Sequence, residues 1–460
     1  MPAISPGAET GMIARWMVGE GDLVNAGDVI AEVSTGTTTM EIEAEDDGRI
    51  KILVAAGTDG VLVNTPIATL SIDQPAEQGL LKNLPEAAAE AAAVAEITAA
   101  GPRLVGSDVQ AAGVALRSAV AATPAAQPHG TGAQTITQSY SAALGAALAE
   151  EMRRDPDVLL MGEEVGQNEG VHKVSRGLLE EFGPRRVIDT PITPAGFAGI
   201  GVGAAFAGLK PVVEFMTWNF AMQAIDQIVN SAAKTHYMSG GKLNVPIVFR
   251  GANGASDRAG AQHAQCYSAW YAHVPGLKVV APATAADAKG LLKAAIRDSG
   301  PVLVLEHEQL YGQIGPVPVH EDWLVPIGVA QVARAGRDAT IVTYGRCVPL
   351  ALAASERLAD EGIDAEVIDL RTLRPLDMAT VLASVARTNR IVTVEEAWPV
   401  CSVGSEVCAR VAIDAFDDLD APPEKVSGAD VPMPYAANLE RLARPSSDDV
   451  VAAVRRVCYA

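Results

Sequence analysis

The first part of the chain alternates apolar and polar positions in short runs. The runs 12–16, 28–33 and 49–54 are separated by Gly, Asn and Asp residues. Strands of this length, bounded by turn residues, are typical of a small all-β fold. We therefore predict a small β-sandwich over residues 1–72.

Residues 73–134 lack any such periodicity and are rich in Ala, Pro, Gln and Gly. A segment of this composition cannot bury a core of its own, so we expect a flexible linker here.

The pattern changes again at residue 135. A helical period runs over 137–154, and continuous apolar strands then alternate with Gly-rich helices at 158–162, 211–215, 245–250, 278–282 and 302–306. Apolar strands between helices indicate a parallel sheet covered on both faces. Further strands at 339–344, 365–369 and 390–395 predict a second α/β unit. The expected domains are 135–315 and 316–460.

Composition narrows the classes of partner. The net charge of −21 argues against binding to nucleic acid or an anionic membrane. The longest apolar run, 195–209, is shorter than the ~20 residues of a membrane span, so we expect a buried helix. Five scattered cysteines without a metal-binding spacing, and no secretory signal at the start, predict a cytoplasmic protein.

Residues 188–199 read I-D-T-P-I-T-P-A-G-F-A-G. This stretch resembles the signature I-D-T-P-I-S-E-x-G-F-A-G of the β subunits of thiamine-diphosphate 2-oxo acid dehydrogenases. In that family the glutamate hydrogen-bonds a ring nitrogen of the cofactor's aminopyrimidine and thereby activates the cofactor. Here its position is Pro194, which has neither an ionisable group nor an N–H.

The resemblance continues to the C-terminus and is closest to the β subunit of the decarboxylating component of the pyruvate dehydrogenase complex. The matching segments, in order, are 160–165, 173–178, 214–220, 230–235, 260–263, 295–298, 370–375 and 428–435. It implies two transketolase-like domains and a tetramer of two α and two β chains. The assembled enzyme would decarboxylate pyruvate and transfer acetyl to lipoyl groups of a dihydrolipoyl acetyltransferase core, toward acetyl-CoA.

Enzymes of this kind hold the diphosphate through Mg²⁺ with a Gly-Asp-Gly…Asn element, whose oxygen ligands suit a hard cation. The chain contains no Gly-Asp-Gly. We therefore expect it to supply the pyrimidine half of the thiamine diphosphate site, and an α subunit to supply the Mg²⁺-diphosphate half.

The resemblance also assigns site residues. Met216 and Phe220 would pack the aminopyrimidine with Ile192 nearby, although an ordinary core role is the alternative. Glu163 and Glu164 follow a strand that should open on the same cleft, and Glu164 is predicted to contact the cofactor. His263, in Gly-Ala-Gln-His, would face the thiazolium and the 2-oxo acid, where imidazole can relay a proton.

Two further sites follow from the family. A potassium ion would bind main-chain carbonyls near a helix end, at Ile247, Ala295, Ile296, Asp298 and Gly300; a plain helix C-terminus is the alternative. In the acidic segment 416–422, Asp420 would dock a basic peripheral-subunit-binding domain of the core, or simply lie on a solvated face.

Within residues 1–72, the elements 19–24, 27–28 and 43–48 resemble a lipoyl domain. That family carries its lipoyl group on a lysine in a T-D-K-A-T-M-E hairpin, but this chain reads T-G-T-T-T-M-E over 35–41. The lysine position is Thr37, whose hydroxyl cannot form the lipoyl amide, so we expect no lipoyl group.

Two alternatives stay open. The losses at Thr37 and Pro194 together favour a catalytically silent paralogue that binds an α subunit or the core as a scaffold or regulator. A β subunit of a branched-chain or acetoin dehydrogenase would share much of the same pattern.

Overall fold

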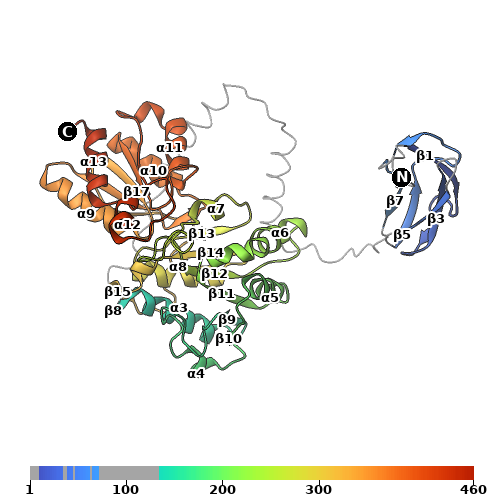
Figure 1. Cartoon of the computed structure of the whole chain (residues 1–460), viewed down its shortest axis with the longest axis horizontal. Coiled ribbons are helices and arrows are strands. Elements are labelled where there is room, and N and C mark those ends of the chain that lie inside the picture. Colours follow the sequence, from blue (N-terminus) through green and yellow to red (C-terminus); the bar gives the residue numbers. More distant parts are fainter. Residues whose placement is uncertain (1–9, 35–38, 45–46, 63–64, 72–133) are drawn as a thin grey trace, which may run out of the picture. The chain divides into compact units, whose positions relative to one another are not determined.

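The computed structural model describes residues 10–34, 39–44, 47–62, 65–71 and 134–460. They fall into two compact units, one before and one after the predicted linker (Figure 1). Thr37 and the linker residues 73–133 lie outside the described residues.

The N-terminal unit consists of two antiparallel sheets, with strand orders β4-β3-β1-β6 and β2-β5-β7. Ile13 and Val33 belong to one apolar cluster and Val24 and Ile50 to another, while Trp16 packs against both. The predicted β-sandwich is therefore confirmed. Its strands are β1 (Thr10–Trp16), β2 (Leu23–Val24), β3 (Val29–Ser34), β4 (Thr39–Glu43), β5 (Gly48–Ile52), β6 (Val61–Leu62) and β7 (Ala68–Ser71).

The second unit contains a seven-stranded sheet in the order β10-β9-β11-β12-β14-β13-β19. All neighbouring strands are parallel except β19, which runs antiparallel to β13 and comes from the C-terminal part of the chain. The strands are β9 (Val158–Gly162), β10 (Val187–Asp189), β11 (Lys210–Thr217), β12 (Val248–Ala252), β13 (Lys278–Val280), β14 (Val302–Glu306) and β19 (Thr372–Arg374).

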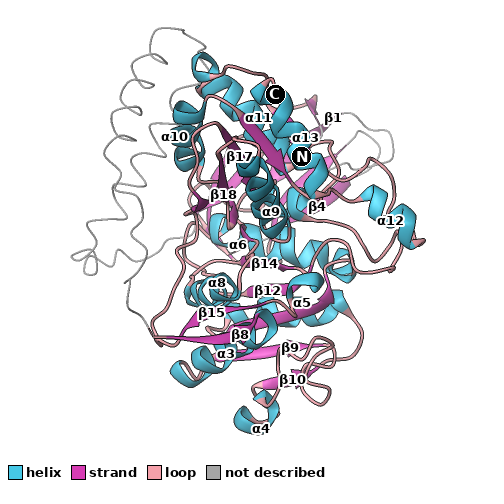
Figure 2. Ribbon diagram, turned by 90° about the vertical axis from the view of Figure 1, so that its left-hand side faces the viewer, coloured by secondary structure: helices cyan, strands magenta, loops and turns pink. Residues whose placement is uncertain are grey.

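Helices cover both faces of this sheet, as the predicted parallel sheet requires (Figure 2). Alternate strand residues point to opposite faces, so Leu160 and Val212 join one core and Leu159 and Val213 the other. The first core is covered by α3 (Tyr140–Arg154) and α8 (Ala285–Arg297). The second is covered by α5 (Pro194–Phe206), η1 (Phe220–Ala224), η2 (Gln227–Ala232), α6 (Ala233–Met238) and α7 (Ser268–Ala272).

Two of the predicted helices need correction. Residues 135–139 form strand β8 (Thr135–Ser139), which pairs with β15 (Ile314–Pro318), and the helix begins only at Tyr140, after its N-cap Ser139. The apolar helix at 195–209 is α5, which ends at Phe206 and is not fully buried. Ile200 is 66% exposed on it and Phe206 40%.

The C-terminal part forms a five-stranded sheet in the order β16-β18-β17-β20-β21, parallel except at β16. Its strands are β16 (Gln331–Arg334), β17 (Ala339–Thr343), β18 (Ala365–Asp369), β20 (Ile391–Val394) and β21 (Glu424–Val426). Its helices are α9 (Cys347–Asp360), α10 (Met378–Thr388), α11 (Val403–Asp414), η4 (Phe416–Asp418), α12 (Ala437–Ala443) and α13 (Ser447–Cys458). Two short helices, α4 (Leu178–Phe182) and η3 (Glu308–Leu310), belong to the larger sheet's half.

Because β9, β10, β11, β12 and β14 are parallel, their carboxyl ends meet at one edge of the sheet. Open α/β sheets bind their ligands at this edge. Among the described residues, no helix is long and apolar enough to cross a membrane.

Candidate functional site

The loops at this edge carry most of the predicted cofactor residues. Glu163 follows β9, Pro194 lies beyond β10, and Met216 lies near the end of β11. Strands β9 and β10 are direct neighbours, with Gly162 opposite Asp189, so Glu163 and Pro194 come from adjacent strand ends.

Phe220 and His263 form one wall of the candidate site. The two rings meet edge to face, with centroids 5.4 Å apart and planes at 79°. Phe220 begins η1 and is half-buried, whereas His263 is exposed on the loop between β12 and α7. Asn219 ties the two segments together, because its side-chain oxygen accepts a hydrogen bond from the Gln265 N–H (3.2 Å).

Pro194 is the first residue of α5 and is buried. Proline suits this position, because the N–H of a first helical residue has no partner within the helix. Thr193 before it makes no side-chain capping bond. Ile192 is 86% exposed, so this chain alone does not bury it.

Several carboxylates near Pro194 in sequence are committed to other contacts. Asp189 accepts the N–H groups of Gly166 (2.6 Å) and Gln167 (2.9 Å) and so fixes the loop after β9. Glu169 accepts the N–H of Gly177 (3.2 Å). Neither carboxylate is available as a substitute for the missing glutamate.

Glu214 is committed to a buried network beneath the site. The guanidinium of Arg250 binds Glu214 on one side and Glu306 on the other, at 2.6 Å to each Glu306 oxygen. Tyr311 donates to Glu306 as well (2.7 Å). Burial raises the pKa of Glu214 more than the Arg250 charge lowers it. The network links β11, β12 and β14 near their carboxyl ends.

Glu163 and Glu164 differ from these carboxylates. In the described part of the chain, neither side chain forms a hydrogen bond or an ion pair. Burial, and then the neighbouring charge of Glu164, raise the pKa of Glu163. A carboxyl group whose pKa is raised in this way holds its proton more readily and is suited to acid–base work. Glu164 is exposed and has a left-handed backbone (φ 59°).

The residues of the predicted potassium site come from the start of β12 and the end of α8. The Ile247 carbonyl accepts the Val302 N–H (3.0 Å), and the Ala295 carbonyl accepts the Asp298 N–H (3.2 Å). Each carbonyl oxygen keeps a second lone pair that could face a cation. The five predicted residues are Ile247, Ala295, Ile296, Asp298 and Gly300.

The carboxylate of Asp298 already has a cationic partner. Lys278 lies 2.6 Å from one of its oxygens, and the Gly300 N–H donates to the other (2.8 Å). Asp298 is also the C-cap residue of α8. A potassium ion here would therefore rest on main-chain oxygens or displace the lysine ammonium.

Asp420, the predicted docking residue, lies after η4 and is exposed. Its carboxylate is 3.1 Å from the Arg390 guanidinium of the same chain. A basic partner would have to share this charge with Arg390.

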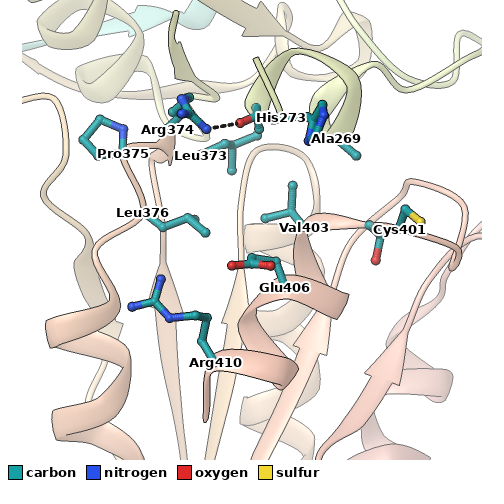
Figure 3. A pocket seen from close by; sticks show the side chains of 12 residues that line it. Ala269, His273, Leu373, Arg374, Pro375, Leu376, Cys401, Val403, Glu406 and Arg410 are labelled. Carbon is teal, nitrogen blue, oxygen red and sulfur yellow. Dashed lines mark hydrogen bonds between the residues drawn. The ribbon is translucent and has the colours of Figure 1, made fainter. Parts of the chain in front are cut away.

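The cavity in Figure 3 lies away from the predicted cofactor residues. Its volume is about 550 Å³, and it lies between α7, the loop after β19 and the start of α11. Arg374 donates to the Ala272 carbonyl on one side (2.8 Å), while Glu406 and Arg410 of α11 lie on the other. Its lining contains none of the residues predicted to hold a cofactor.

The loop between β12 and α7, which carries His263, is held by residues of the C-terminal part of the chain. Sequence reasoning missed these residues. Glu396 is the main one, and it contacts His307 (2.9 Å) and Arg346 (3.4 Å). The available signal was a charged residue directly after the buried strand predicted at 390–395.

Comparisons with known proteins agree with this architecture. Residues 137–313 match the family "transketolase, pyrimidine binding domain", residues 328–450 match "transketolase, C-terminal domain", and residues 1–70 match "biotin-requiring enzyme".

Two curated relatives cover most of the chain. The pyruvate dehydrogenase E1 component subunit beta of Rhizobium meliloti is 56% identical over 100% of this chain and 98% of its own length. The mitochondrial subunit beta-1 from Arabidopsis thaliana is 59% identical over 75% of this chain and 95% of its own. A solved structure described as a split-gene transketolase, inactive β4 tetramer, superposes with a TM-score of 0.58. It is 25% identical and covers 70% of this chain and 98% of its own.

Proposed function

Because this chain belongs to the family of pyruvate dehydrogenase E1 component β subunits, we propose that it is the β subunit of a complex that oxidatively decarboxylates pyruvate. In that role it acts with an α subunit on thiamine diphosphate and passes the acetyl group to lipoyl groups, toward acetyl-CoA. The observation that carries the proposal is the Phe220–His263 wall at the carboxyl edge of the sheet.

The wall fits one half of thiamine diphosphate. Half-buried Met216 and Phe220 offer apolar surface against which an aminopyrimidine ring would pack, with Ile192 nearby. When bound, the cofactor supplies a nucleophilic carbon for attack on the keto group of pyruvate. Exposed His263, on the same wall, would hold or release a proton near the substrate oxygen.

Position 194 does not fit the cofactor's usual requirement. The buried proline offers no proton and no hydrogen bond to a pyrimidine nitrogen. Glu163, at the adjacent strand end and with a raised pKa, is the carboxyl group best placed to substitute, and Glu164 is the next candidate. We propose slow turnover unless one of these groups reaches the ring.

An α subunit is required on two grounds. The chain has no Gly-Asp-Gly element, so Mg²⁺ and the diphosphate would bind on the α subunit. The apolar helix α5 also exposes Ile200 and Phe206, and exposed apolar surface of this kind marks a subunit interface. The proposed assembly is a heterotetramer of two α and two β chains.

Three finer assignments belong to the same proposal. Potassium would bind the carbonyls of Ile247, Ala295 and Ile296, with Asp298 and Gly300 nearby. Asp420 would dock the dihydrolipoyl acetyltransferase core. A cytoplasmic location would suit the five cysteines, all of which are free thiols.

A second candidate function rests on Pro194 itself. A β chain without the activating carboxylate could assemble with α subunits or the core as a silent scaffold or regulator. The N-terminal domain, without a lysine at position 37, would then contribute binding rather than acyl transfer.

One experiment separates the two functions. The chain is co-expressed with a pyruvate dehydrogenase α subunit. Three activities of the complex are compared: release of CO₂ from pyruvate, release of CO₂ from 2-oxoisovalerate, and cleavage of acetoin. Decarboxylation of pyruvate above the rate of the α subunit alone supports the enzyme. Assembly without turnover of any of the three substrates supports the silent paralogue.

A further inference from the structure

The loop that carries His263 closes on itself at its base. It runs from Asn253 to Cys266, between β12 and α7, and the Gly254 N–H donates to the Gln265 carbonyl (3.0 Å). The Asn253 side chain accepts the Tyr267 N–H (2.8 Å). These bonds fix the two ends of the loop but leave its middle to be held by other elements.

The first half of the loop, before His263, is held by the C-terminal part of the chain. A carboxylate oxygen of Glu396, just after β20, accepts the Ala255 N–H. A carboxylate oxygen of Glu440, in α12, accepts the Arg258 N–H (3.1 Å). Arg258 has a left-handed backbone (φ 56°), and its guanidinium lies 5.7 Å from the centre of the Tyr435 ring.

Glu396 is itself fixed from two sides. Its second oxygen lies 2.9 Å from His307, at the end of β14, and 3.4 Å from Arg346, after β17. The backbone of Gly254 packs closely against this pair. A Cβ at this position would lie only 3.0 Å from both Glu396 and the His307 ring. The cavities beside Glu396 are only about 20 and 10 Å³, which leaves room for about one water molecule at most.

We propose that Glu396, assisted by Glu440, is a positioning residue. From the second α/β domain, it holds the His263 loop so that the His263 ring stays against the Phe220 ring. The inference rests on the proposed function for the role of His263, but the contacts themselves do not. A catalytic group displaced by about 1 Å can lose about 10²-fold in rate, so such an anchor matters for chemistry.

The test measures hydrogen exchange of the full-length protein by mass spectrometry. In Glu396→Ala, amides of residues 255–263 should exchange about 10- to 100-fold faster, the equivalent of losing one hydrogen bond to a charged group. Glu396→Gln keeps an oxygen for the Ala255 N–H and should give a smaller increase. Peptides from β17 and β18 should not change.

Glu395→Gln is the matched control. Glu395 is adjacent and more deeply buried, and it accepts the N–H of Gly404 in α11 (2.8 Å) and the hydroxyl of Tyr344 after β17 (2.9 Å). This variant should loosen the start of α11 and leave 255–263 protected. Equal loosening of the loop by both variants would overturn the proposal in favour of general destabilisation.

A second readout follows the imidazole directly. In protein with isotope-labelled histidine, the His263 ring resonance, assigned with His263→Gln, should carry a ring-current shift from Phe220 that Phe220→Leu removes. Glu396→Ala should move the resonance toward the Phe220→Leu position. If the Ala variant does not fold, Glu396→Gln and Glu440→Gln decide, and an unchanged His263 signal with unchanged loop exchange in both would refute the anchor.

The outcome does not depend on turnover. A silent α/β complex with a loosened loop would defeat the enzyme proposal and keep the anchor. If the complex is active but replacing Glu396 and Glu440 does not change the loop, the enzyme proposal stands and the anchor is refuted.

Discussion

Replacing Pro194 by glutamate should raise the rate of pyruvate decarboxylation by the α/β complex. The change restores a carboxyl group where the family's signature carries one, and a well-placed acid–base group is worth about 10²–10⁴-fold. That factor corresponds to about 3–5 kcal/mol of activation free energy. The site is buried, so the new carboxyl group should have a raised pKa, as Glu163 already does.

The fold should tolerate the substitution. Pro194 is the first residue of α5, a position whose N–H has no partner within the helix. The new N–H of glutamate therefore breaks no helix hydrogen bond. Losing the proline lowers the unfolding free energy by about 0.4–1 kcal/mol, because the unfolded chain gains conformational freedom. An acidic residue in the first turn of a helix returns about 0.3–1 kcal/mol. These two contributions offset each other, but the buried carboxyl group also costs desolvation energy, so the unfolding free energy of the variant is measured beside its rate.

The assay is CO₂ release at saturating cofactor and pyruvate, with Pro194→Gln as the matched control. Glutamine has nearly the same shape without the acid, so it should stay near the starting rate. Equal acceleration by both variants would show that removing the proline, not adding the carboxylate, is responsible. Should the unmodified complex already turn over at about 10 s⁻¹ and gain nothing, Glu163→Gln becomes the decisive variant.

Four further outcomes are expected. The isolated chain should show little binding of thiamine diphosphate with Mg²⁺ by calorimetry, and an added α subunit should create the site; tight binding by the chain alone would contradict the division. Thr37→Lys should gain the mass of one lipoyl group with a lipoyl ligase, while the unmodified chain should not. Arg250→Met should leave two buried carboxylates unpaired and lower the unfolding free energy by about 3–5 kcal/mol in urea, with Arg250→Lys in between. Burial alone would raise the pKa of Glu396, but the charges of His307 and Arg346 lower it to about 2. Its stabilising contribution should thus be complete above about pH 4.3 and disappear as the pH falls toward 2, so acid unfolding of Glu396→Gln should be flatter in that window.

The buried strands could be read from the sequence because their signal is local. Continuous apolar runs gave β9, β14 and β18 with the bounds that the structure has. Strand β8 could not be read in this way, because its partner β15 lies far along the chain and the alternation in T-I-T-Q-S is short. Strand β19 has only three residues, and its partner β13 belongs to the other half of the unit.

The candidate site could be proposed from the sequence as a set of residues, but not as an arrangement. Phe220 and His263 could each be assigned from a motif, yet their ring contact depends on how η1 and a long loop approach one another. Glu396 carries no motif meaning of its own. Its role appears only when β14, β20 and the loop after β12 meet, which is a consequence of packing between domains.

The same physics explains why family membership does not settle activity at position 194. Helix α5 needs only a residue that tolerates its first turn, and proline satisfies that requirement better than most. The stability of the fold therefore does not require a glutamate at position 194. The surrounding helix, strand and core can form without that carboxyl group. Stability and chemistry make separate demands on this one residue. A well-formed Phe220–His263 wall is thus compatible with either a slow enzyme or a silent one, and only the rate with and without a carboxylate at position 194 distinguishes them.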